Sequence, residues 1–260
     1  MVLPYRLLWD NHSLSPASGL NTILMKTILA IETATDACSV ALSQGNSVRQ
    51  RHEITPRQHS QRLLGMLEEL LPGGTLLEHG VEAVAYGCGP GSFTGLRIAA
   101  SAVQGLCFAT GLPAVPLSTL AVQAQTAYRL GHVKEGQTIF SALDARIKEI
   151  YSAWFVVKDG RVVPLTLARA CSPSDVQLPD AFANAVGIGS GCHFIDDMPH
   201  TMRSALQSVS AEVLPEARDL VPLALELIAR GETQTARQVQ PVYVRDEINW
   251  KKIPQQGKQT

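Results

Sequence analysis

The stretch Gly87-Cys-Gly-Pro-Gly-Ser-Phe-Thr-Gly-Leu-Arg97 follows an apolar run at residues 81–86 and opens a long segment of small residues. Glycine and proline at this density mark a backbone turn that larger side chains would obstruct. Residues 96–110 have the pattern of a helix, which Gly111 ends in a left-handed conformation. The sequence therefore predicts a strand, a glycine-rich turn and a helix in succession.

Two interpretations of this turn are open. Successive backbone N–H groups in such a turn can bind a phosphate, and a helix N-terminus adds positive potential. The spacing fits neither the P-loop, which needs four residues between its glycines, nor the dinucleotide fingerprint, which needs glycine at position 94, where this chain has Thr94, so any phosphate site here would be of another type. Alternatively, the glycines let the helix pack closely on the sheet. The residues of the turn are Gly89, Pro90, Gly91, Ser92, Phe93, Thr94 and Gly95.

Composition limits the classes of function. A chain of 260 residues is long enough for two lobes, and its net charge of −1 argues against a protein that holds nucleic acid by itself. The five cysteines form no C-x-x-C pair, so we expect neither a zinc ribbon nor a disulfide framework and predict a cytoplasmic location. No stretch approaches the roughly 18 apolar residues of a membrane span.

Hydrophobic periodicity predicts an α/β protein. Strands are expected at residues 27–33, 38–42 and 47–54, and leucines recur with helical spacing over residues 59–71. A second β-rich segment begins near residue 138. From these patterns we predict a poorly ordered N-terminal extension, a first α/β lobe, a second α/β lobe and a polar tail, at residues 1–24, 25–115, 116–245 and 246–260.

Catalytic signatures are weak. No two of the seven histidines lie three to five residues apart, so we predict no metal site, and no G-x-S-x-G elbow is present. Cys88 lies at the turn, where backbone amides could lower its pKa, or is a packed thiol. The helices at residues 59–71 and 96–110, the second rich in small residues, either form a dimer face or pack only on their own sheet.

The end of the first strand resembles the first phosphate loop of the actin, sugar-kinase and Hsp70 superfamily. That loop usually contains Asp-x-Gly-Thr, whereas this chain has Glu32, Thr33, Ala34 and Thr35. Glu32 replaces the aspartate, and the Cβ of Ala34 stands where a nucleotide would approach. The resemblance implies a two-lobed actin/Hsp70-like (ASKHA) fold with a degenerate nucleotide site.

Several blocks of sequence, spread from about Met25 to Lys252, closely resemble the TsaB (YeaZ) family. The blocks are residues 28–42, Pro56-Arg-Gln-His-Ser60, Gly89-Pro-Gly-Ser-Phe-Thr-Gly-Leu-Arg97, Asp144-Ala-Arg146 with Glu149-Ile-Tyr151, and Pro241-Val-Tyr-Val-Arg245 with Trp250-Lys-Lys252. Many members of the family have Asp at position 32 and Arg at position 88, where this chain has Glu32 and Cys88.

The resemblance implies a non-catalytic scaffold that activates a TsaD-like subunit by forming a heterodimer with it. With a TsaE-like ATPase, the pair supports transfer of threonylcarbamoyl to N6 of the adenosine 3′ to the anticodon in tRNAs that read ANN codons. In isolation, such chains form homodimers through the same helical face of the first lobe. The implied interface residues are His59, Leu63, Met66, Leu67, Leu70, Arg97, Ala99, Ala102, Val103, Gly105 and Leu106.

Two other functions are weighed against this scaffold. The first is a stand-alone metallopeptidase-like or ATP-hydrolysing enzyme, which the missing histidine pair and Ala34 disfavour. The second is direct tRNA contact by Arg245, Lys251 and Lys252, whereas the family resemblance implies that tRNA is reached only through the complex. We expect no cofactor and no membrane partner.

Overall fold

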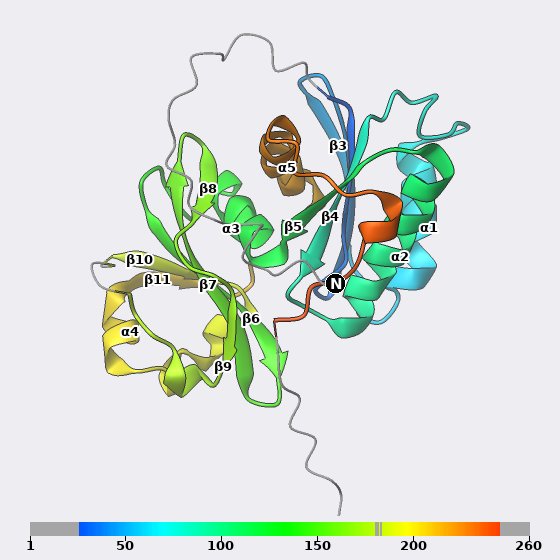
Figure 1. Cartoon of the computed structure of the whole chain (residues 1–260). Coiled ribbons are helices and arrows are strands. Elements are labelled where there is room, and N and C mark those ends of the chain that lie inside the picture. Colours follow the sequence, from blue (N-terminus) through cyan, green and yellow to red (C-terminus); the bar gives the residue numbers. More distant parts are fainter. Residues whose placement is uncertain (1–25, 180–181, 183, 245–260) are drawn as a thin grey trace, which may run out of the picture.

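Two mixed sheets make up the body of the computed structural model, which describes residues 26–179, 182 and 184–244 (Figure 1). The predicted extension at 1–24 and the tail at 246–260 lie outside the described residues. Three antiparallel strands begin each sheet, and strands parallel to the first of the three complete it. The chain thus has the expected two-lobed actin/Hsp70-like fold.

The first sheet has the order β3-β2-β1-β4-β5. β1 and β4 are buried along their whole length, as near-continuous apolar runs predict for strands covered on both faces. Helices α1 and α2 lie together against one face of this sheet (Figure 1). These elements are β1 (Ile28–Glu32), β2 (Ala37–Gln44), β3 (Ser47–Ile54), α1 (His59–Leu70), β4 (Ala83–Gly89), α2 (Phe93–Thr110) and β5 (Ala114–Ser118).

The ends of α2 follow from its sequence. The Ser92 hydroxyl accepts a hydrogen bond from the Gly95 N–H at the N-terminus, which is the expected function of an N-cap serine. At the other end Gly111 adopts φ 73°, and its N–H donates to the Cys107 carbonyl. The predicted C-terminal stop at Gly111 is confirmed, and the helix begins three residues earlier than residue 96.

The second sheet has the order β11-β10-β6-β7-β8, with β9 paired to β7. Gly189 follows β10 and leads into a 3₁₀ segment. These elements are β6 (Thr138–Arg146), β7 (Glu149–Lys158), β8 (Arg161–Pro164), β9 (Arg169–Cys171), η2 (Pro173–Asp175), β10 (Ala185–Ile188), η3 (Ser190–Asp197), α4 (His200–Ala205) and β11 (Leu206–Ser210).

Helix α3 (Thr119–Arg129) lies between the two sheets, and every residue from Thr119 to Ala127 is buried. α5 (Leu220–Ala229) covers the face of the first sheet opposite α1 and α2 (Figure 1). α5 falls within the predicted second lobe at residues 116–245, but the helix contacts β1, β4 and β5 of the first lobe. Its apolar pattern predicts that it is buried without specifying which sheet it covers.

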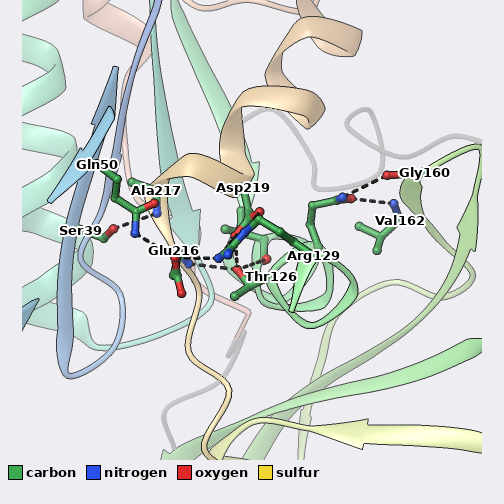
Figure 2. Close-up of polar contacts among 11 residues, drawn as sticks. Ser39, Gln50, Thr126, Arg129, Gly160, Val162, Glu216, Ala217 and Asp219 are labelled. Atoms are coloured by element: carbon green, nitrogen blue, oxygen red, sulfur yellow. Dashed lines mark hydrogen bonds and ion pairs between the residues drawn. The ribbon is translucent and has the colours of Figure 1, made fainter. Parts of the chain in front are cut away.

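A polar network fixes α3 against both lobes (Figure 2). Arg129 of α3 binds both carboxylate oxygens of Asp219 in the short segment η4 (Ala217–Asp219), with Nε–O distances of 2.8 and 3.0 Å. Glu216, just before η4, pairs with Arg129 at 2.7 Å and accepts from Gln50 of β3 at 2.8 Å. The lobes are therefore joined by directional bonds as well as by a shared apolar core.

After α5 the chain crosses back along the first lobe. We call residues 231–244 the C-terminal strap; it contains η5 (Ala236–Gln238). Gln234 pairs with Ala114 of the edge strand β5 through two backbone hydrogen bonds of 2.8 Å. Farther on, the Val242 N–H donates to the Cys88 carbonyl at 2.8 Å. The strap thus covers the edge of the first sheet and ends beside the glycine-rich turn.

Candidate functional site

Glu32 ends β1 with its carboxyl group fully buried. Oε1 accepts a hydrogen bond of 2.7 Å from the Ala34 N–H, whereas Oε2 lies against Gly87 and has no hydrogen-bond partner. Burial raises the pKa of Glu32 to about 7, although the N–H groups of Ala34 and Thr33 act in the opposite direction. The side chain is therefore directed into the protein.

The glycine-rich turn packs directly on the loop that follows Glu32. A Cβ on Gly91 would come within 2.5 Å of the Ala34 carbonyl oxygen, and a Cβ on Gly95 would collide with the Thr33 carbonyl oxygen. No residue with a side chain fits at these two positions without moving the backbone. The glycines are thus required for close contact between the two loops, which is the packing interpretation of the turn.

Several polar groups of the two loops form hydrogen bonds within the chain. The Ala34 carbonyl accepts from the Ser92 N–H at 2.7 Å, and the Thr33 hydroxyl donates to the Gly95 carbonyl at 2.8 Å. The Ala34 N–H donates to Glu32 and the Gly95 N–H donates to the Ser92 hydroxyl, so these two amides already have acceptors within the chain. That the loop is a degenerate phosphate site stays a prediction.

The remaining residues of these loops divide between interior and surface. Gly89 and Pro90 are buried and joined by a cis peptide bond, and Thr35 is half-buried. Phe93 and Thr94 are exposed. Burial raises the pKa of the neighbouring Cys88 thiol to about 12, so this cysteine is a packed thiol and not an activated one.

Most of the predicted interface residues face the interior of their own lobe. The buried set contacts the sheet, and His59 also bonds the Ala37 carbonyl through Nε2 at 3.2 Å. These side chains pack on their own sheet, and their place in an interface stays a prediction. The buried residues are His59, Leu63, Met66, Leu67, Leu70, Ala99 and Val103. Those that reach the surface, wholly or partly, are Arg97, Ala102, Gly105 and Leu106.

The outer face of α1 and α2 is apolar at positions that the sequence analysis did not select. Leu64 of α1 is 69% exposed and Phe108 of α2 is 77% exposed. Gly105 of α2 is also exposed, and a Cβ there would meet nothing within 4 Å. Leu64 and Phe108 are apolar residues on the otherwise solvent-facing side of each amphipathic helix, and that position is the signal by which a sequence could reveal them.

Three exposed side chains form a cluster at the N-terminal end of α2. The Arg97 guanidinium carbon lies 3.9 Å from the centroid of the Phe93 ring, and Arg97 Nε donates to the Tyr243 hydroxyl at 3.1 Å. The two rings are 5.5 Å apart. Tyr243 belongs to the C-terminal strap, so this cluster joins the strap to α2.

The described residues show neither a metal-binding cluster nor a membrane-spanning helix. Within residues 26–179, 182 and 184–244 no three His, Cys, Asp or Glu side chains are grouped so as to hold a metal ion. None of the helices in the same part of the chain is long and apolar enough to cross a membrane.

Comparison with known proteins identifies the family. The family model described as "TsaD: tRNA N6-adenosine threonylcarbamoyltransferase" matches residues 45–247. The Escherichia coli tRNA threonylcarbamoyladenosine biosynthesis protein TsaB is 37% identical over 233 residues, 87% of this chain and 98% of the relative. The chain belongs to the TsaB family.

Further relatives of the TsaB family agree with this assignment. The Haemophilus influenzae protein of the same name is 34% identical over 88% of this chain and 97% of its own length. The solved structure of YeaZ from Pseudomonas aeruginosa superposes with a TM-score of 0.76 at 38% identity, covering 84% of this chain and all of that one. The resemblance to TsaB and YeaZ that the sequence blocks indicated is thus confirmed.

Proposed function

We propose that this chain is a non-catalytic scaffold subunit in the biosynthesis of threonylcarbamoyladenosine in tRNA. In this proposal it binds a TsaD-like subunit through the outer face of α1 and α2, and a TsaE-like ATPase binds to the pair. The threonylcarbamoyl group is transferred to N6 of the adenosine 3′ to the anticodon in tRNAs that read ANN codons. tRNA is reached only through the complex, and two copies of the chain pair through the same face when the partner is absent.

The single observation that carries the proposal is the exposure of Leu64 on α1 and of Gly105 and Phe108 on α2. Exposed apolar side chains of this size contribute to an interface where a partner element covers them. Gly105 and its small neighbour Ser101 let a partner helix approach the backbone of α2 closely. The internally bonded loop at Glu32 supports a binding role over nucleotide chemistry.

The substitution Gly105→Arg tests this face. An added Cβ at this exposed position meets nothing within 4 Å, so we expect the fold to be retained, while a partner helix over α2 would bury an unpaired charge. In an equimolar mixture with a TsaD-like subunit, sedimentation should show the one-to-one complex for the parent chain and separate species for the variant. The matched control is Ala229→Arg at the exposed end of α5, on the opposite face of the sheet.

Each outcome of this experiment has a definite meaning. Loss of the complex in Gly105→Arg alone, together with loss of the homodimer, supports one shared face for both assemblies. If Gly105→Arg pairs as well as Ala229→Arg does, the partner binds elsewhere and the proposed face is wrong. Hydrolysis of ATP by the pure chain, in proportion to its concentration, would contradict the non-catalytic role.

A further inference from the structure

We propose that Arg97 is a pre-organised receptor for one carboxylate side chain of the partner subunit. This inference rests on the proposed function, because it places the receptor at one end of the face that the TsaD-like subunit covers. It adds the chemistry of the contact and assigns a role to Tyr243 of the C-terminal strap.

Two neighbouring side chains hold the Arg97 guanidinium in place. Phe93 stacks beneath it at 3.9 Å on the same helix, one turn earlier. The Tyr243 hydroxyl accepts from Nε at 3.1 Å, and this bond comes from a segment 146 residues away in sequence. A long exposed arginine normally loses much rotamer freedom when it binds a partner. Here two neighbours restrict the side chain in advance.

The described residues use only part of the hydrogen-bonding capacity of the Arg97 guanidinium. Nε is used by Tyr243, but neither Nη nitrogen of Arg97 has an acceptor among the residues that the structure describes. Those two nitrogens and their fixed geometry suit a carboxylate, which accepts two parallel hydrogen bonds from a guanidinium. The two Nη nitrogens are thus available to a carboxylate of a partner.

Two other arginines of the chain bind a carboxylate in the way that we propose for Arg97. Arg62 donates to both carboxylate oxygens of Glu53, at 2.8 and 2.5 Å, and Arg129 does the same with Asp219. Both of these arginines are satisfied by carboxylates of their own lobe or its neighbour. α2 itself contains no Asp or Glu along its length, so its own helix offers Arg97 no such partner.

The charges and aromatic residues around Arg97 indicate whether its partner is a protein carboxylate or an RNA phosphate. A surface that holds a nucleic acid backbone presents several cations together. Arg97 is the only Lys or Arg in α2, and the whole chain has a net charge of −1. The aromatic neighbours Phe93 and Tyr243, exposed by 56% and 45%, are typical of anchors in protein interfaces. The observations therefore favour a carboxylate on a protein partner.

The position of the cluster fits this role. Arg97 precedes Gly105 by about two turns of the same helix, so both lie within the span of one packed partner helix. Phe108 lies one further turn along, at the far end. A partner that covers Gly105 can thus place an acidic residue at Arg97.

The experiment measures the affinity of the full chain for its TsaD-like subunit with Arg97→Ala, Arg97→Lys and Tyr243→Phe. We expect Arg97→Ala to weaken binding about tenfold or more, and Arg97→Lys to weaken it nearly as much, because a lysine lacks the fork. Tyr243→Phe, which keeps the ring and removes only the acceptor for Nε, should weaken binding about threefold. Ala229→Arg is the control, and circular dichroism checks that each variant is folded.

A second measurement separates a lost contact from a structural effect. Millimolar guanidinium ion should partly restore binding of Arg97→Ala and should leave the parent chain unchanged. Binding by Arg97→Lys at parent affinity, or the absence of any such recovery, would overturn the proposal. So would a loss of tRNA binding by the complex with pairing intact, since that result assigns Arg97 to a phosphate.

This test can fail separately from the proposed function. If Gly105→Arg abolishes pairing while every Arg97 variant pairs normally, the face is correct and only the carboxylate receptor is wrong. If Gly105→Arg also pairs normally, the partner does not use α2, and the proposed function loses its interface.

Discussion

The glycine-rich turn and the outer face of α1 and α2 belong to the same lobe, but they differ in the space that an added Cβ would find. At Gly91 and Gly95 a single Cβ would strike the backbone of the loop after β1. At Gly105, on the helix that begins in this turn, a Cβ would meet nothing. One region is closed by contacts within the chain, and the other is left open.

This difference shows why a prominent motif need not be a binding site. The turn combines glycines, a helix N-terminus and an adjacent carboxylate, all of which occur in phosphate sites. Yet the Ser92 N–H donates to the Ala34 carbonyl and the Gly95 N–H donates to the Ser92 hydroxyl, and Gly91 and Gly95 lie against the loop after β1, so the motif serves packing. The outer face of α1 and α2 instead exposes Leu64 and Phe108, which match no motif.

The largest effect is expected from adding one methyl group to the closed region. Gly95→Ala places a Cβ against the Thr33 carbonyl, so either the loop after β1 or the start of α2 must move. We expect the free energy of unfolding to fall by about 3 kcal/mol or more, or the variant not to fold. Urea unfolding followed by circular dichroism measures this change.

Gly105→Ala is the matched control within the same helix. Because its Cβ has open space, the variant should gain up to about 1 kcal/mol from the higher helix propensity of alanine. Equal effects of the two substitutions would mean that the turn and the outer face do not differ as described. In that case the glycines of the turn would need another explanation.

The next effect concerns the buried carboxyl of Glu32. Its pKa is raised by burial to about 7 in the folded chain, compared with 4.5 as the ordinary value. The folded state therefore retains a proton that the unfolded state releases, and stability falls as the pH rises from about 4.5 to 7. Above pH 7 both states are ionised and this contribution no longer changes.

Glu32→Gln removes this titration with little change in shape. Relative to the parent chain, the variant should become more stable by up to about 3 kcal/mol between pH 4.5 and pH 8. Urea unfolding of both chains at several pH values measures the difference. Parallel pH profiles would show that Glu32 is not a buried neutral acid at low pH.

The sequence predicted most elements but not how they are used. Helices α1 and α2 were predicted nearly to their ends, because leucine periodicity and Gly111 are local signals. The interface assignment to Leu63, Met66 and Leu67 selected side chains that the structure buries. An amphipathic helix directs its apolar stripe toward its own core, so the outer residues, such as Leu64, are those left for a partner.

The sequence patterns did not predict where α5 and the C-terminal strap lie in the fold. Nothing in residues 220–244 indicates that α5 and the C-terminal strap cover the first sheet, since a helical period does not name the partner sheet. The strap is nevertheless what brings Tyr243 to Arg97. Single-chain patterns identify the arginine and the tyrosine but do not bring them together.

A smaller effect is expected at the boundary between the two regions. The Ser92 hydroxyl accepts from the Gly95 N–H at 3.3 Å and is exposed, so Ser92→Ala removes a helix cap without crowding either loop. The free energy of unfolding should fall by about 1 kcal/mol. Ser92→Gly should lower the free energy of unfolding by only about a few tenths of a kcal/mol. A larger loss for glycine than for alanine would show that capping is not the cause.

The smallest effect on stability, and the most informative for function, is expected from Leu64→Ser combined with Phe108→Ser on the open face. Both side chains are more than two-thirds exposed, so their removal should change the free energy of unfolding by less than about 0.5 kcal/mol. If a partner covers them, the same variant should bind the TsaD-like subunit about tenfold more weakly, because the apolar area that is buried only in the complex is lost. Leu77→Ser, at an exposed leucine in the loop after α1, is the control for the loss of surface leucine. A variant that binds normally would leave the exposure of Leu64 and Phe108 without a function and would remove the contrast between the closed turn and the open face as a guide to the partner.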